Sequence, residues 1–269
     1  MAREKIITTE SIGPEDEDYN ASLRPYRLDE CIGTGDLFEK LRIAISAARQ
    51  RNEPMEHVLL HGPPGLGKTT LAYVIAHEMD TTVKVTSGPS LTRPSDLIGI
   101  LTNLEARDVL FIDEIHRLSP AVEEYIYPAM EDFKVDFVVD SGMHSRTINL
   151  PLKPFTLLGA TTRAGMLSPP LRSRFGITHH MDYWSDADLL KRATMSAEML
   201  KMEYDESALA QLAGRARGTP RIINRLLRRC RDYAQVKGSG RLDISAINSA
   251  LKLEGIDAVG LDDLDRRFL

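Results

Sequence analysis

The chain has 269 residues, of which 42% are hydrophobic and 27% are charged, as in ordinary soluble globular proteins. No stretch approaches the roughly 18 apolar residues of a membrane span, and none near the N-terminus resembles a signal peptide, so we expect a cytoplasmic protein without membrane contact. The net charge of −5 excludes a surface that is basic throughout, so any contact with nucleic acid must be local.

The first part of the chain predicts an α/β domain behind a flexible arm. Residues 1–20 are acidic and lack a hydrophobic pattern, so we expect a mobile arm there. From Asp36, apolar residues recur at helical spacing and predict a helix over 36–51. Short apolar runs then alternate with helical or loop segments: 57–61, 82–86, 109–113, 155–160 and 178–182. This alternation is typical of a parallel β-sheet covered by helices on both faces.

After Tyr183 the strand-like runs end and helical spacing takes over. Gly218, Pro220 and Gly238–Gly240 separate the predicted helices, which are 186–201, 205–217, 220–236 and 243–253. We therefore predict a sheet-containing domain over 21–183, an all-helical domain over 184–256, and the opening of a further element over 257–269.

The loop after the first predicted strand matches the phosphate-binding pattern in full. Its residues are Gly62, Pro63, Pro64, Gly65, Leu66, Gly67, Lys68 and Thr69. Glycines at these positions let successive backbone N–H groups turn toward phosphate oxygens, and the following helix adds the positive end of its dipole. Lys68 would reach the outer phosphates, and the Thr69 hydroxyl would bind magnesium. The loop therefore predicts a site for a magnesium–nucleoside triphosphate.

Two acidic residues end the run 109–113, where ligands bind in open α/β sheets. Asp113 would hold the metal through its water shell, and Glu114 would act as general base on the attacking water. Alone, such a pair could equally be a solvated acidic turn. Behind a phosphate-binding loop, the catalytic interpretation is favoured.

Three later segments carry polar groups of uncertain purpose. Residues 159–163, Gly-Ala-Thr-Thr-Arg, end another apolar run, and a hydroxyl there could orient water or simply close a strand. Arg172 and Arg174 lie in a polar turn, either solvated or presented to a neighbour's nucleotide. Arg221 begins a helix, where its charge opposes the dipole unless an anion is present. Farther along this helix the arginines are predicted to line a solvated face, in preference to contacting nucleic acid: Arg225, Arg228, Arg229 and Arg231.

Taken together, these motifs resemble the AAA+ ATPases and, among them, the RuvB family of bacterial motors that drive branch migration of Holliday junctions. The resemblance begins near Leu23 and includes runs outside the phosphate-binding loop: 101–105, 111–120, 127–132, 159–165 and 217–221. It implies ATP and Mg²⁺ as ligands.

The resemblance also assigns roles to individual residues. Lys68, Thr69 and Thr70 take the loop roles, and Asp113 and Glu114 the metal and water roles. Thr162 would be the first sensor, Arg174 a finger acting on the adjacent subunit, and Arg221 the second sensor, carried by the helical lid. The remaining nucleotide contacts implied by the family are Leu23, Arg24, Glu131, Asp132 and Phe133.

A hairpin is predicted over 135–152. Apolar Val135, Phe137 and Val139 alternate before Ser141-Gly142, and Ile148 and Leu150 follow. In the family this insertion docks on RuvA, and the motor is a hexameric ring on branched DNA. These properties are therefore expectations for this chain.

The chain departs from the family pattern at two places. Trp184 stands where the family has a tyrosine near the nucleotide, so ring stacking could persist without a hydroxyl contact. The family's winged-helix domain would begin where this chain ends, so we expect weak DNA binding. Two other interpretations stay open: a clamp-loader-type AAA+ switch, and an assembly module that binds ATP with little turnover.

Overall fold

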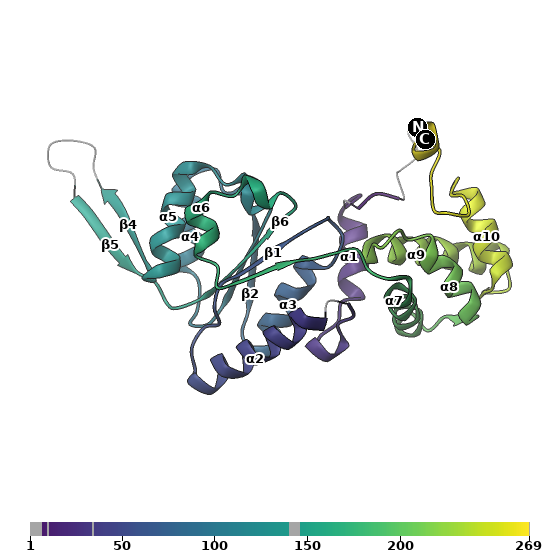
Figure 1. Ribbon diagram of the computed structural model, residues 1–269, viewed down its shortest axis with the longest axis horizontal. Helices are drawn as coiled ribbons and strands as arrows, with labels where there is room; N and C mark the ends of the chain where they lie inside the picture. Colours follow the sequence, from purple (N-terminus) through teal and green to yellow (C-terminus); the bar gives the residue numbers. More distant parts are fainter. Residues whose placement is uncertain (1–6, 10, 34, 140–145, 269) are drawn as a thin grey trace.

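The computed structural model describes residues 7–9, 11–33, 35–139 and 146–268. Figure 1 shows two halves joined end to end, one built on a β-sheet and the other mainly helical, with α7 to α10. Among the described residues, no helix has both the length and the apolar character that crossing a membrane requires.

The sheet contains five parallel strands in the order β2-β3-β6-β1-β7. Their bounds are Val58–His61 (β1), Val83–Ser87 (β2), Val109–Asp113 (β3), Thr156–Thr161 (β6) and Ile177–His180 (β7). In register, Val58 lies between Leu158 of β6 and Ile177 of β7. Each strand overlaps a predicted apolar run, so the α/β prediction is confirmed.

Helices cover both faces of this sheet. Successive side chains of a strand point to opposite faces of the sheet, and both faces are buried, so the runs are apolar throughout. Leu60 and Phe111 pack in the core under α2 and α3, whereas Leu59 and Leu110 pack in the core under α4 and α5. The covering helices are α2 (Gly35–Arg51), α3 (Lys68–Glu78), α4 (Pro94–Thr102), α5 (Pro120–Glu131) and α6 (Pro169–Ser173). Short 3-10 turns lie at Leu28–Glu30, Gly88–Ser90, Ile115–Arg117 and Ala164–Met166.

A β-hairpin projects from the end of the molecule farthest from the helical half (Figure 1). Its strands are β4 (Lys134–Val139) and β5 (Arg146–Pro151), which pair antiparallel with Val135 opposite Leu150. The predicted hairpin is therefore present. Its expected turn at Ser141-Gly142 lies outside the described residues.

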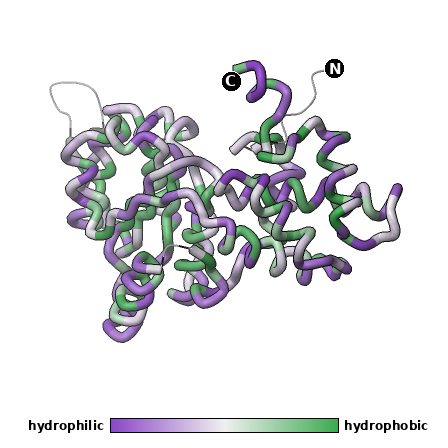
Figure 2. Tube along the Cα trace, turned by 45° about the vertical axis from the view of Figure 1, so that its right-hand side comes forward, coloured by the Kyte–Doolittle hydropathy of each residue, from purple (hydrophilic) through white to green (hydrophobic). Residues whose placement is uncertain are grey.

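The helical half has its own hydrophobic core, and Figure 2 shows hydrophobic segments inside both halves. Its helices are α7 (Asp186–Met199), α8 (Glu206–Gly214), α9 (Pro220–Lys237) and α10 (Ile244–Leu253). These bounds agree with the predicted helices within a few residues. A short parallel pairing of β8 (Glu203–Tyr204) with β9 (Arg241–Leu242) was not predicted, because two-residue strands leave no periodic pattern.

The N-terminal segment packs on the helical half. The mobile arm expected for residues 1–20 is wrong for residues 11–20, because α1 spans Pro14–Ser22 and packs against α9. The Asp16 carboxylate accepts from Arg225 Nε at 2.9 Å and Nη2 at 2.7 Å, and the two side chains are only 5% and 4% exposed. The predicted solvated position of Arg225 is therefore also wrong: its charge lies inside the molecule, paired with an acid 209 residues away.

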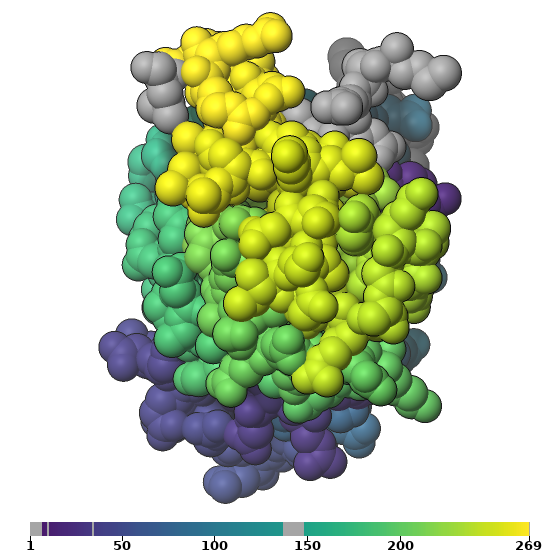
Figure 3. All heavy atoms as spheres, turned by 90° about the vertical axis from the view of Figure 1, so that its right-hand side faces the viewer, coloured from purple at the N-terminus to yellow at the C-terminus, as the bar shows by residue number. Residues whose placement is uncertain are grey.

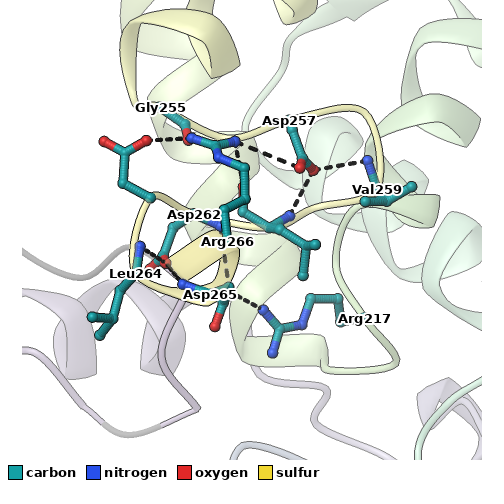
Figure 4. A network of polar contacts seen from close by, with 10 residues as sticks. Arg217, Gly255, Asp257, Val259, Asp262, Leu264, Asp265 and Arg266 are labelled. Carbon is teal, nitrogen blue, oxygen red and sulfur yellow. Dashed lines mark hydrogen bonds and ion pairs between the residues drawn. The ribbon is translucent and has the colours of Figure 1, made fainter. Parts of the chain in front are cut away.

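The chain's last segment folds back onto the helical half (yellow in Figure 3). Figure 4 shows how polar contacts fix it: Arg217 Nη1 lies 2.5 Å from Asp265 Oδ2, and Arg266 Nη2 donates to the Gly255 carbonyl at 3.1 Å. Asp262 Oδ1 accepts at 2.8 Å from the backbone N–H of Asp265, the first residue of α11 (Asp265–Phe268). This segment is thereby tied to the turn that leads into α9.

Candidate active site between the sheet and the helical lid

The phosphate-binding loop connects β1 to α3, as its sequence predicts. Gly62 has φ of +139°, and a Cβ there would lie 2.3 Å from the Met181 carbonyl oxygen, so no side chain fits. Gly67, with φ of +98°, is the N-cap of α3 and turns the chain in a left-handed conformation that suits glycine. The loop therefore directs backbone N–H groups and the positive end of α3 at one point, an arrangement that binds phosphate.

Lys68 is the buried cation of this loop. Its Nζ donates to the carbonyls of Gly62 at 2.9 Å and Pro63 at 2.7 Å, and the residue is 7% exposed. Burial lowers the pKa of the Lys68 ammonium to about 8, an effect that Asp113 partly opposes. A phosphate anion would favour the charged form and could replace these carbonyls as the partner.

The acidic pair ends β3 beside this loop. Asp113 Oδ1 accepts from the backbone N–H of Glu114 at 2.8 Å, and Glu114 has φ of +47°. The Glu114 carboxylate lies 3.0 Å from Arg117 Nη1, with both side chains about half exposed. Both acids line the same cavity as Lys68. One acid is thus placed to hold a metal and the other to accept a proton.

A polar cluster at the end of β6 completes this wall. Thr162 lines the cavity, and its neighbour Thr161 is buried, with Oγ1 2.8 Å from His116 Nδ1. Burial lowers the pKa of the His116 imidazole, although Glu114 opposes the shift. Sequence reasoning missed His116 because a histidine after an acidic pair has no motif of its own. Its contact with Thr161 became visible only with the strand order, which places β3 beside β6.

Arg221 forms the opposite wall from the start of α9. Its backbone N–H donates to the Gly65 carbonyl at 3.3 Å, and its Nη1 donates to the Thr9 carbonyl at 3.1 Å. Burial lowers the pKa of the guanidinium, and neighbouring Arg225 adds to this shift. Arg221, for which the sequence predicted an anionic partner, therefore lies beside the phosphate-binding loop, and its guanidinium donates to a backbone carbonyl.

Flat and apolar groups line the remaining side. Trp184 packs over Gly33, and its backbone N–H donates to Gly218 at 2.9 Å. In the described part of the chain, the buried indole Nε1 has no hydrogen-bond partner. Arg24 lines the cavity and lies 4.5 Å from the ring centre of Tyr73. Leu23 is buried behind it and contributes its carbonyl, which accepts from Arg192 at 2.6 Å.

The cavity enclosed by these walls has a volume of about 800 Å³. That is large enough for a nucleotide. It brings together most of the predicted site: Arg24, Pro64, Gly65, Leu66, Gly67, Lys68, Thr69, Thr70, Asp113, Glu114, Thr162, Trp184 and Arg221. Gly62 and Pro63 lie at its edge as the partners of Lys68. The N-terminal segment adds Ser11, Glu17 and Asn20, which its acidic composition did not reveal.

Seven predicted residues do not line this cavity: Leu23, Gly62 and Pro63, described above, and Arg174, Glu131, Asp132 and Phe133. Arg174 ends α6, where its Nη2 lies 3.0 Å from Glu131 Oε1. Asp132 pairs with Lys134 at 2.8 Å, and the ring of Phe133 packs edge-on against Phe155. A single chain therefore does not bring Arg174 or residues 131–133 to the loop. Contact with a nucleotide would need one bound by another subunit.

The residues present fit a magnesium–triphosphate. The donor set, a buried lysine, a loop of turned-in N–H groups, and the oxygens of Thr69 and Asp113, is the chemistry that phosphate and Mg²⁺ require. Glu114 stands beside this set as the candidate base.

Comparison with known proteins supports a nucleotide-binding domain followed by a lid domain. Residues 23–181 match the family model described as "Holliday junction DNA helicase RuvB P-loop domain", and residues 184–257 match "RuvB AAA lid domain". The RuvB subunit of the Holliday junction branch migration complex of Flavobacterium johnsoniae is 52% identical over 97% of this chain and 77% of that protein. The corresponding Myxococcus xanthus protein is 51% identical over the full chain and 78% of its own length.

Solved structures agree. The Thermotoga maritima RuvB Holliday junction branch migration motor superposes with a TM-score of 0.82 at 46% identity, over 91% of this chain and 78% of that one.

Proposed function

Because this chain belongs to the RuvB family, we propose that it hydrolyses ATP to drive the branch migration of Holliday junctions in DNA recombination and repair. The observation that supports this most strongly is the cavity in which Lys68, Asp113 and Glu114 of the sheet face Arg221 of the helical half. We assign residues 21–183 to the ATPase domain and 184–256 to the lid. Because the proposed substrate is DNA, we also propose that the protein acts in the cytoplasm.

Binding is assigned to the loop and its surroundings. The backbone of residues 62–67 and the Lys68 ammonium hold the phosphates, and Thr70 stands beside them. Thr69 and Asp113 hold Mg²⁺, which when bound neutralises charge on the outer phosphates. Arg24 and Trp184 form the nucleobase side with buried Leu23 beside them, and the indole supplies a stacking surface in place of the family's tyrosine ring.

Chemistry is assigned to Glu114 and Thr162. Glu114 takes the proton of the attacking water, and the Thr162 hydroxyl orients that water. In the described conformation Glu114 Oε2 pairs with Arg117 Nη1 at 3.0 Å, an interaction that competes with its role as base. An exposed ion pair of this kind is weak enough to exchange readily.

Coupling to movement is assigned to Arg221. Its guanidinium leaves the Thr9 carbonyl for a phosphate, and because Arg221 begins α9, the shift moves a helix that runs through the lid core. Nucleotide state is thereby converted into a rotation of the lid.

Arg174 and residues Glu131, Asp132 and Phe133 are assigned to a nucleotide in the adjacent subunit of a hexameric ring. Their position away from their own chain's cavity supports this assignment. The β4–β5 hairpin is the proposed docking element for RuvA, since it projects from the ATPase domain on the side away from the lid (Figure 1).

A mixing experiment tests the shared site. Arg174→Ala lacks the finger, and Glu114→Gln lacks the base, so each variant alone should bind ATP and hydrolyse it poorly. In mixed assemblies, an Arg174→Ala subunit with an intact Glu114 receives Arg174 from a Glu114→Gln neighbour. Hydrolysis in the mixture, measured with a four-way junction present, should exceed the sum of the separate variants.

The other outcomes separate the rival functions. Co-assembled variants whose activity never exceeds that sum would contradict hydrolysis shared between subunits. Turnover without movement of a labelled junction would indicate a clamp-loader-type switch. Nucleotide-dependent assembly without turnover would indicate an assembly module.

A further inference from the structure

The side chain of Arg174 is held on three sides by its own subunit. Its guanidinium lies 4.3 Å from the ring centre of Tyr127, Nη1 donates to the Pro170 carbonyl at 2.6 Å, and Nη2 pairs with Glu131 at 3.0 Å. The side chain is only 20% exposed, which is low for an arginine in a polar turn. Its position is therefore built by the fold around it.

Tyr127 forms one of these three sides, and neighbouring groups fix its ring. The Tyr127 hydroxyl donates to Glu123 Oε1 at 2.5 Å and lies 3.1 Å from Ser168 Oγ. The Ser168 hydroxyl also donates a hydrogen bond to Glu123 and caps the N-terminus of α6, the helix whose C-cap is Arg174. One polar cluster thus joins α5, where Tyr127 lies, to both ends of the segment that carries the finger.

From this geometry we propose that Tyr127 is a positioning residue for ATP hydrolysis in the neighbouring subunit. Its ring is the surface against which the Arg174 guanidinium is held ready to face that subunit's nucleotide. The proposal rests on the proposed function, because it needs Arg174 to act across a subunit boundary.

Physical reasoning explains why a ring is used there. In the described part of the chain, the buried Arg174 Nε has no hydrogen-bond partner, so this part of the guanidinium lacks a polar contact. The π face of a tyrosine attracts a partly desolvated cation without fixing it through a directional bond. Arg174 is therefore pre-ordered yet able to move to a phosphate, which lowers the entropic cost of reaching the transition state. Glu131, its charged partner, is 54% exposed and can release it.

Two variants separate the ring from the hydroxyl. Tyr127→Leu removes the π face, and we expect kcat to fall roughly tenfold while the KM for ATP stays within about twofold. Tyr127→Phe keeps the ring, and its kcat should stay within about threefold of that of the unmodified chain. A helical circular-dichroism spectrum and ATP affinity like those of the unmodified chain would show that Tyr127→Leu is folded.

Mixing then shows on which side of the interface Tyr127 acts. If Tyr127 acts through Arg174, a Tyr127→Leu subunit still offers Glu114 and lacks only a well-placed finger. Mixed with Glu114→Gln, it should gain activity above the sum of the two variants. Mixed with Arg174→Ala, it should gain none, because neither subunit presents a competent finger.

The opposite pattern would overturn the proposal. If Tyr127 supported its own subunit's nucleotide site, rescue would come from Arg174→Ala and not from Glu114→Gln. Undiminished turnover in Tyr127→Leu would overturn it as well. The Arg174→Ala and Glu114→Gln mixture is the reference: failure of that pair contradicts the shared site itself, whereas its success with failure of Tyr127→Leu rescue contradicts only the role of Tyr127.

Discussion

The buried ion pair between Asp16 and Arg225 should decide whether the N-terminal segment stays on the lid. Asp16→Ala leaves the Arg225 guanidinium inside the molecule without its bidentate acid, which was bound at 2.9 Å and 2.7 Å. Removing one partner of such a buried pair costs about 3–5 kcal/mol. That corresponds to a roughly 10²- to 10⁴-fold change in the equilibrium for detaching the segment.

Hydrogen exchange of the backbone amides of α1 measures this directly, because detachment exposes them. We expect amide exchange in residues 15–22 to accelerate at least 10²-fold in Asp16→Ala, with the sheet amides unchanged. Glu15→Gln is the matched control: its side chain is 91% exposed and lies 3.7 Å from Arg228, so its exchange should stay near that of the unmodified chain. Equal exchange in both variants would refute the idea that this pair holds α1.

The same pair predicts an acid response. Burial raises the pKa of the Asp16 carboxyl, but the Arg225 hydrogen bond and charge outweigh it and hold the pKa below its ordinary value of 3.8. A lowered folded-state pKa contributes stability above pH about 4 and loses it as the pH falls further. Protection of α1 should therefore drop below that pH in the unmodified chain and be less pH-dependent in Asp16→Ala.

Two further predictions concern the nucleotide. Because burial lowers the pKa of Lys68 to about 8, triphosphate binding at pH 8.5 should take up protons, measurable as a buffer-dependent enthalpy in calorimetry. The Lys68→Met variant should bind triphosphate more weakly and without this proton uptake. Equal uptake in both proteins would show that Lys68 is not the group that gains the proton. Trp184 is the chain's one tryptophan and lines the cavity, so ADP should change its fluorescence saturably, and an unchanged spectrum at saturating ADP would place the nucleobase elsewhere.

Local sequence signals predicted the elements that carry the catalytic groups. Three elements depend only on neighbours within a few residues, so the sequence predicts them: the loop around Lys68, the strand ending at Asp113 and the amphipathic start of α9 at Arg221. The parallel sheet follows from the same runs, because strands buried on both faces must be apolar throughout.

Contacts between segments far apart in the chain could not be predicted from the sequence. The acidic residues of α1 appeared to be a solvated arm because the partner of Asp16 is 209 residues away, and Arg225 could not be distinguished from the other arginines of α9. The contact of His116 with Thr161 likewise depends on β3 lying beside β6. The surroundings of Arg174 could not be predicted either, because Glu131 and Tyr127 both lie on α5. They meet Arg174 only because α5 packs beside α6.

The central claim is that Glu114 activates water for hydrolysis of ATP held by Lys68 and Thr69. Glu114→Gln keeps the shape of the side chain and removes its basicity. ATP turnover and ATP affinity should be measured for both proteins with Mg²⁺ and a four-way junction. We predict unchanged affinity and a fall in turnover of ~10²-fold or more. Turnover within a factor of about two of the unmodified chain would contradict the account, because general-base removal costs far more than that.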